Sequence, residues 1–127
     1  MDSIDISDPL MRREVLKTNN NPGESIDYIV TVKGRLDRLK NTEGGREVII
    51  RYVPDRYVVT PESFQAYLET LEALTWNTLE EVAVAAAKDI SNELLTRWAQ
   101  ANLRTGDPEN DQALTHDVTI EDRTEQT

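Results

Sequence analysis

Few residues of this chain have side chains that could perform acid–base or nucleophilic chemistry. There is no cysteine, and His116 is the single histidine, so thiolate nucleophiles, disulfides, iron–sulfur clusters and cysteine-ligated zinc are excluded. Glu80 and Glu81 are adjacent carboxylates, but successive residues of a helix lie about 100° apart and cannot face each other as an acid–base pair. Neither a Gly-x-Gly-x-x-Gly nor a Walker pattern is present to hold a nucleotide phosphate. An enzyme using one of these mechanisms is therefore the weakest hypothesis.

Metal binding would need a site made of oxygen ligands alone. The acids Asp107, Glu109 and Asp111 alternate along the chain, but the glycine and glutamate that complete a calcium-binding loop do not follow them. We therefore expect no metal site.

The overall composition limits the classes of partner. The chain has 127 residues, which is roughly one domain of about 100 to 150 residues. Asp and Glu number 24 against 14 Lys and Arg, and the formal charge of −10 argues against direct nucleic-acid binding. No apolar run has the length of a signal peptide or of a membrane-spanning segment. We expect a soluble, cytoplasmic protein with no membrane partner.

The charge is unevenly distributed. Residues 106–127 hold seven acids and one arginine, a net charge of −6, and favour either a frayed acidic end or a single strand over residues 114–120. Residues 33–56 hold seven Lys and Arg and four acids, a net charge of +3. This basic segment has two interpretations: a solvated hairpin whose charges pair with the acidic segment, or a seat for a phosphate.

The elements that must position these groups follow from the apolar pattern. Residues 26–32 and 47–53 are rich in β-branched and aromatic side chains, and the Gly-rich connector between them predicts an antiparallel hairpin. Thr60 as cap and Pro61 at the first helical position then begin a helix that is expected to end near Leu74. A capping box at residues 78–81 begins a second helix.

Residues 98–105 allow two interpretations, a continuation of the second helix or a third strand. If the strand forms and residues 114–120 are a fourth, the fold is α+β: a four-stranded antiparallel sheet with two helices on one face. The order is strand, strand, helix, helix, strand, strand. We expect a polar N-terminal arm over residues 1–24, a domain over 25–105 and an acidic segment over 106–127. The unpaired edges and uncovered face of such a sheet predict self-association into a ring or stacked rings.

A set of residues in this order resembles one known family. The most specific block lies at the end of the second strand, and it reads Tyr52-Val53-Pro54-Asp55-Arg56. The other matches, at similar separations, are Lys17-Thr18, Asn21-Pro22, Asp27-Tyr28, Ile50-Arg51, Ser63-Phe64, Tyr67-Leu68, Glu80, Asp89 and Arg97-Trp98. The chain thereby resembles the tunnelling fold (T-fold) and, within it, the NADPH-dependent 7-cyano-7-deazaguanine (nitrile) reductase family. The resemblance covers roughly residues 16–105 and implies an oligomer with binding sites between subunits.

The differences from the family lie at its chemical groups. The family uses a cysteine in the connector between the first two strands, and residues 34–45 contain none. A hydroxyl such as that of Thr42 is a far poorer nucleophile than a thiolate. Leu79 stands where the family has a histidine, and Ser63 alone remains of a Glu-Ser-Lys-Ser signature. Nitrile reduction is therefore not expected, and NADPH is implied by the resemblance only, so we expect no cofactor.

The resemblance assigns Glu80 and Ser63 to ligand binding. In the fold family a glutamate at the position of Glu80 accepts paired hydrogen bonds from the N–H edge of a purine or pterin ring, a task that suits a carboxylate. The other interpretation of Glu80 is that it only stabilises the helix dipole. Trp98 likewise is either a core aromatic or a plate for base stacking.

Two functions remain. One is binding of a purine-like or 7-deazaguanine ligand in the queuosine-related pathway. The other is a non-catalytic oligomeric scaffold, or a partner subunit for a catalytic paralogue. They differ in whether Glu80 recognises a ligand.

Overall fold

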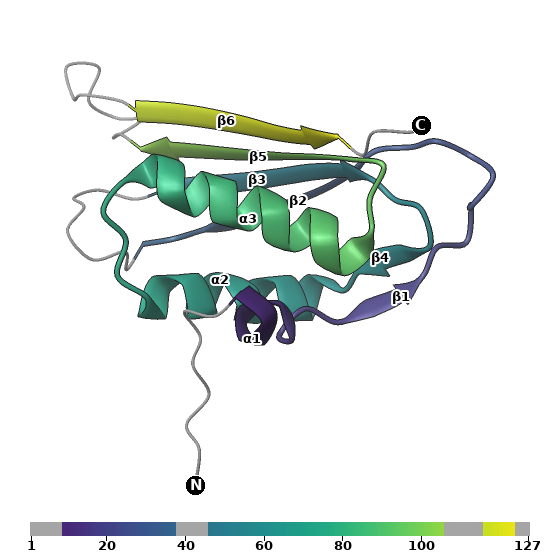
Figure 1. Ribbon diagram of the computed structural model, residues 1–127, viewed down its shortest axis with the longest axis horizontal. Helices are drawn as coiled ribbons and strands as arrows, with labels where there is room; N and C mark the ends of the chain where they lie inside the picture. Colours follow the sequence, from purple (N-terminus) through teal and green to yellow (C-terminus); the bar gives the residue numbers. More distant parts are fainter. Residues whose placement is uncertain (1–8, 38–45, 106–115, 124–127) are drawn as a thin grey trace, which may run out of the picture.

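A computed structural model describes residues 9–37, 46–105 and 116–123. Its main element is a four-stranded antiparallel sheet whose strands lie in the order β2 (Val30–Arg35), β3 (Arg46–Val53), β5 (Trp98–Thr105) and β6 (His116–Arg123). The helices α2 (Pro61–Ala73) and α3 (Leu79–Leu94) lie on the same side of this sheet (Figure 1). The predicted α+β class and the four-stranded antiparallel sheet are confirmed.

The two helices begin where the sequence predicts. Thr60 caps α2 and its side chain accepts a hydrogen bond from the Ser63 amide at 3.3 Å. Thr78 caps α3 and accepts from the Glu81 amide at 3.1 Å. These bonds satisfy backbone donors that a helix leaves without intrahelical partners, so they fix the first turn of each helix.

Residues 98–105 form a strand and do not continue α3. Leu95 adopts a left-handed conformation with φ of 54° and ψ of 49°, which ends the helix. Ala99, Ala101 and Leu103 are fully buried and alternate with more exposed residues, as expected for a strand with one face on the core. The sequence predicts a strand over residues 114–120, and β6 forms over His116–Arg123, while positions 114 and 115 lie outside the described residues. β6 pairs with β5 from Trp98 opposite Arg123 to Thr105 opposite His116.

The first strand lies later than predicted. The sequence indicates a strand over residues 26–32, whereas β2 begins at Val30. Ile26 and Ile29 are 62% and 59% exposed, so their β-branched side chains do not pack in the core. Asp27 instead accepts a hydrogen bond from Arg97 at 2.5 Å, and Tyr28 donates one to Asn21 at 2.5 Å. These side-chain contacts hold the residues before β2 as a connection.

The segment expected as a polar arm, residues 1–24, contains two elements. The short helix α1 (Pro9–Arg13) packs on α3, and β1 (Thr18–Asn20) pairs antiparallel with β4 (Tyr57–Val59) in a second sheet. All three β1 residues are exposed, so its ladder forms through backbone hydrogen bonds without an apolar side-chain pattern. No helix in the described ranges is long and apolar enough to span a membrane.

The core lies between the sheet and the two helices. Val48, Ile50 and Tyr52 of β3 belong to the same buried cluster as Tyr67 and Leu68 of α2, and all five side chains are at most 1% exposed. Further buried residues come from α3, which contributes large apolar side chains and also the small residues Ala83, Ala86 and Ala87. Small side chains at these positions let α3 lie close to β5.

A glycine allows α2 to approach β2. A Cβ atom placed on Gly34 would lie 2.2 Å from Leu68 Cδ1, and Leu68 is fully buried. Leu68 therefore occupies space that any larger residue at position 34 would need.

We predict that Gly34→Ala destabilises the protein by about 1–3 kcal/mol, because the added methyl group overpacks the contact with Leu68. Urea denaturation measures this change. Gly23→Ala is the matched control, since a Cβ there meets its nearest atom, in Tyr28, at 3.5 Å. Equal stability of the two variants would contradict the predicted close contact.

Candidate functional site

Glu80 lies at the mouth of a pocket formed where α3 begins. The pocket has a volume of about 320 Å³, and its lining consists of Arg46, Asn77, Thr78, Leu79, Glu80, Thr105 and His116. The Glu80 side chain is 54% exposed, and its Oε1 atom lies 3.0 Å from Nε2 of His116 on β6. The first turn of α3 thus presents a carboxylate that solvent and a ligand can both reach.

His116 was not among the predicted site residues, because the sequence places it in the acidic segment. Pairing of β5 with β6 sets it opposite Thr105, whose hydroxyl accepts a hydrogen bond from the His116 amide at 3.0 Å. Leu79, which aligns with a histidine of the family that the sequence resembles, is buried in the core. The imidazole beside Glu80 therefore comes from a different element. Only the register of β5 and β6 could have revealed that His116 lies beside Glu80.

A cation lies beneath the same pocket. Arg46, the first residue of β3, is 3% exposed, and burial lowers the pKa of its guanidinium because desolvation disfavours the charged form. The pocket therefore combines a carboxylate that accepts hydrogen bonds, an imidazole and a guanidinium. Of these groups the carboxylate can only accept hydrogen bonds from a donor, and the guanidinium can only donate them.

Ser63 lies apart from Glu80, in the first turn of α2. Its hydroxyl oxygen accepts hydrogen bonds from the Lys17 amide at 2.9 Å and from the Thr60 hydroxyl at 2.8 Å. The contact with Lys17 connects the first turn of α2 to the residue that precedes β1. Within one chain, Ser63 and Glu80 therefore do not meet.

Most of the residues behind the family resemblance meet at the end of the fold where β1 and β4 pair. Asn21 is 6% exposed; its backbone amide donates a hydrogen bond to the Arg56 carbonyl at 2.7 Å, and its side-chain Nδ2 donates to the Asp55 carbonyl at 2.7 Å. Arg97 bridges Asp27 at 2.5 Å and Asp55 at 3.5 Å. The motif residues at this end therefore hold loops together.

Trp98 starts β5 on the sheet face that carries no helices. It is half-buried, opposite Val53 and Arg123, and its indole Nε1 is buried without a hydrogen-bond partner among the described residues. It lies outside the core between the sheet and the helices.

Polar side chains cover much of the rest of this helix-free face, around the buried Ile49 of β3. Arg51 donates to Gln100 at 3.2 Å, and Gln100 donates to Glu121 at 3.3 Å. Arg104 pairs with Asp117 at 2.9 Å, and this pair lowers the pKa of the Asp117 carboxyl. These cross-strand bonds link β3, β5 and β6, so the face is compatible with water.

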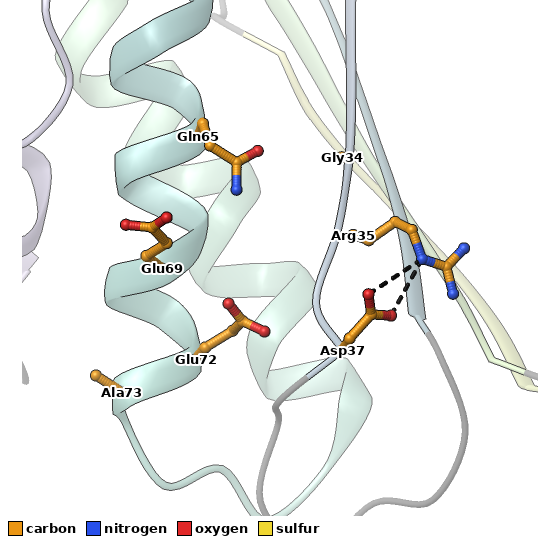
Figure 2. Close-up of a pocket in the computed structure, with 7 residues that line it drawn as sticks. All are labelled: Gly34, Arg35, Asp37, Gln65, Glu69, Glu72 and Ala73. Atoms are coloured by element: carbon orange, nitrogen blue, oxygen red, sulfur yellow. Dashed lines mark hydrogen bonds and ion pairs between the residues drawn. The ribbon is translucent and has the colours of Figure 1, made fainter.

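A wider hollow of about 770 Å³ lies between β2 and α2 (Figure 2). Gly34, Arg35 and Asp37 line one side, and the α2 residues Gln65, Glu69, Glu72 and Ala73 line the other. The Asp37 carboxylate accepts from Arg35 Nε at 3.1 and 3.4 Å. Glu80 and His116 are absent from this lining, so the hollow is separate from the pocket at α3.

Asp89 belongs to a buried cluster that joins the three helices. Its carboxylate accepts from Arg12 Nε at 2.5 Å and Nη2 at 3.0 Å, and from the Tyr67 hydroxyl at 2.5 Å. The Arg12 guanidinium also lies 5.9 Å from the centre of the Trp76 ring, within range of a cation–π contact. The hydrogen bond to Asp89 raises the pKa of Arg12, and burial together with the Asp89 charge raises that of Tyr67 well above its ordinary value.

No three histidine, aspartate or glutamate side chains gather as a metal site within the described ranges. The acids at positions 107, 109 and 111 lie outside those ranges. No protein-family model matches the sequence, and no curated protein matches it. The resemblance to nitrile reductases therefore depends on the motif residues alone.

We predict that Asp89→Asn destabilises the protein by about 3–5 kcal/mol, because it leaves the buried Arg12 charge without a counter-charge. Chemical denaturation measures the loss. Glu93→Gln is the control: Glu93 pairs with Arg13 across the same two helices, but at 3.6 Å with its side chain 33% exposed. That change should cost less than about 1 kcal/mol. Similar losses in the two variants would contradict the special role of Asp89.

The raised pKa of Tyr67 predicts a loss of stability in alkali. An unfolded tyrosine ionises near pH 10, whereas the buried hydroxyl stays protonated to higher pH. The contribution of the protonated Tyr67 hydroxyl to the free energy of unfolding is therefore complete below about pH 10, and it declines as the pH rises above that value. Tyr67→Phe should be less stable at neutral pH and lose less stability between about pH 9 and 11. Parallel pH profiles of the two proteins would refute this coupling.

Proposed function

We propose that the protein is a T-fold protein related to the nitrile reductases that binds a purine-like or 7-deazaguanine ligand in the queuosine-related pathway without reducing a nitrile. The observation that carries this proposal is the position of Glu80. Its carboxylate is exposed in the first turn of α3, over a pocket that also contains Arg46 and His116.

The chemistry of a carboxylate supports this ligand class. Two oxygens can accept two parallel N–H bonds from the edge of a purine-like ring, and bonds to a charged acceptor are the stronger kind. In the free protein Oε1 of Glu80 is in contact with His116. A ligand with two adjacent N–H groups would therefore replace the imidazole at that oxygen and add a bond at the other.

The absence of cysteine supports a function without covalent chemistry. No thiolate is present to add to a nitrile, and NADPH would be a cofactor by family resemblance alone. We propose that the protein works by binding only.

The separation of Ser63 from Glu80 supports a site shared between subunits. The two residues lie in the first turns of α2 and α3, and Ser63 is hydrogen-bonded near β1 while Glu80 contacts β6. We propose that a second copy in a ring brings its own Ser63 region to the pocket of the first.

A second candidate is a non-catalytic oligomeric scaffold, or a partner subunit of a catalytic paralogue. The observation that favours it is that Glu80 already has two stabilising partners, His116 and the positive end of the α3 dipole. In that case no ligand is needed to explain the carboxylate.

We predict that 7-cyano-7-deazaguanine, guanine or a pterin raises the melting temperature of the wild-type protein, and that Glu80→Gln weakens binding at least about tenfold, since it removes a hydrogen bond to a charged acceptor. Thermal shift and calorimetry measure these effects. Glu81→Gln is the matched control, because the adjacent acid is exposed and lies outside the pocket lining.

No shift with any of these compounds would refute ligand binding and favour the scaffold. An equal loss of binding in Glu80→Gln and Glu81→Gln would show that general charge, and not the pocket, attracts the ligand. Co-purification with a catalytic paralogue would favour the partner-subunit alternative.

A further inference from the structure

Cations of the basic segment over residues 33–56 gather on the helix-free face of the sheet. The strand register sets Lys33 of β2 opposite Ile49 of β3, and Ile49 opposite Asn102 of β5. By the same register, the other charged residues that the four strands place on this face are Arg35, Glu47, Arg51, Arg104, Asp117, Glu121 and Arg123. Together with Lys33 they comprise five Lys or Arg and three Asp or Glu. The face is therefore net positive, although the whole chain has a formal charge of −10.

A pocket of about 360 Å³ lies on this face, between β3, β5 and β6. Its lining includes Ile49, which is 7% exposed, and two guanidinium groups, those of Arg51 and Arg104. Arg51 stands opposite Gln100, and Arg104 lies four residues further along β5, so the two cations reach the pocket from its two ends. The other lining residues are polar, namely Gln100, Asn102, Asp117 and Thr119.

The hydrogen bonds around this pocket leave donors in excess. Asp117 is the acid of the lining, and both of its oxygens are occupied: Oδ1 accepts from Asn102, and Oδ2 accepts from Nε of Arg104 at 2.9 Å. Arg51 donates one bond, from Nη1 to Gln100 at 3.2 Å. An arginine has five N–H groups. Among the described residues, most donors of these two guanidiniums therefore have no protein acceptor.

We infer that this pocket binds the phosphate group of a small ligand between Arg51 and Arg104. Guanidinium groups bind phosphate through paired, charge-assisted hydrogen bonds. A phosphate ester has a charge of about −1.5 to −2 at neutral pH and three strong acceptor oxygens, so it can accept from cations at both ends of the pocket. The site goes beyond the function proposed above, since Glu80 and His116 are absent from its lining.

Asp117 gives the inference a test of sign. Its carboxylate is the negative charge nearest to the bound phosphate, and it takes up one N–H group of Arg104. Asp117→Asn should therefore strengthen phosphate binding about two- to fivefold, the range of an exposed charge interaction. A site for a cationic ligand would respond in the opposite direction.

Calorimetric titration of the full chain with inorganic phosphate and with pyrophosphate, at about 50 mM salt to limit screening, measures the binding. We expect saturable binding of a single ligand per chain, weakened at least about tenfold in Arg51→Gln and in Arg104→Gln. Arg123→Gln is the matched control, because it removes a cation of the same face that lies outside the pocket lining. It should change the affinity less than about threefold, and circular dichroism confirms that each variant is folded.

No saturable binding of either probe would overturn the inference. Equal losses in Arg104→Gln and Arg123→Gln would also overturn it, since the net charge of the face would then attract the anion without the pocket. Weaker binding in Asp117→Asn would contradict a site for an anion.

The purine-like ligand proposed for the pocket at α3 is tested separately. Arg51→Gln and Arg104→Gln should leave the thermal shift with 7-cyano-7-deazaguanine, guanine or a pterin unchanged, because both residues lie outside the lining of that pocket. Loss of the shift in these variants would overturn the assignment of two separate sites. Failure of the purine-like compounds to bind leaves the phosphate titration to decide this inference alone.

Discussion

The buried ion pair between Arg12 and Asp89 constrains most of this structure. Two charges taken out of water are stable only with close partners, so α1 must lie where Arg12 reaches Asp89 of α3 and where Tyr67 of α2 can donate to the same carboxylate. The cluster therefore fixes the three helices relative to one another. Because α3 also packs on β5 and β6, that constraint extends to the sheet.

The same helix that holds Asp89 in its interior presents Glu80 at its first turn. Asp89 is 2% exposed and the Glu80 side chain is 54% exposed, nine residues apart on one rigid element. The burial of Asp89 fixes the helix, and the exposure of Glu80 leaves its carboxylate available to His116 and to solvent. Two acids that look equivalent in the sequence thus have opposite physical roles, and only their environment separates them.

Local signals were sufficient to predict α2 and α3, since Thr60, Pro61 and Thr78 determine backbone geometry within one turn, but they did not predict α1. Local signals did not predict the segments whose structure depends on contacts between distant parts of the chain. Residues 26–29 have a strand-like composition, but contacts of Asp27 with Arg97 and of Tyr28 with Asn21 place them outside the sheet. β1 forms from exposed polar residues because its partner β4 lies nearby. The pairing of Glu80 with His116 required a strand register that no periodicity reveals.

The two faces of the sheet differ in what covers them. The face toward the helices is filled by its own core, whereas the opposite face is linked by hydrogen bonds such as Arg51 to Gln100 and Arg104 to Asp117. A polar face of this kind does not need an apolar cover, because its side chains already form hydrogen bonds across the strands and can stay hydrated.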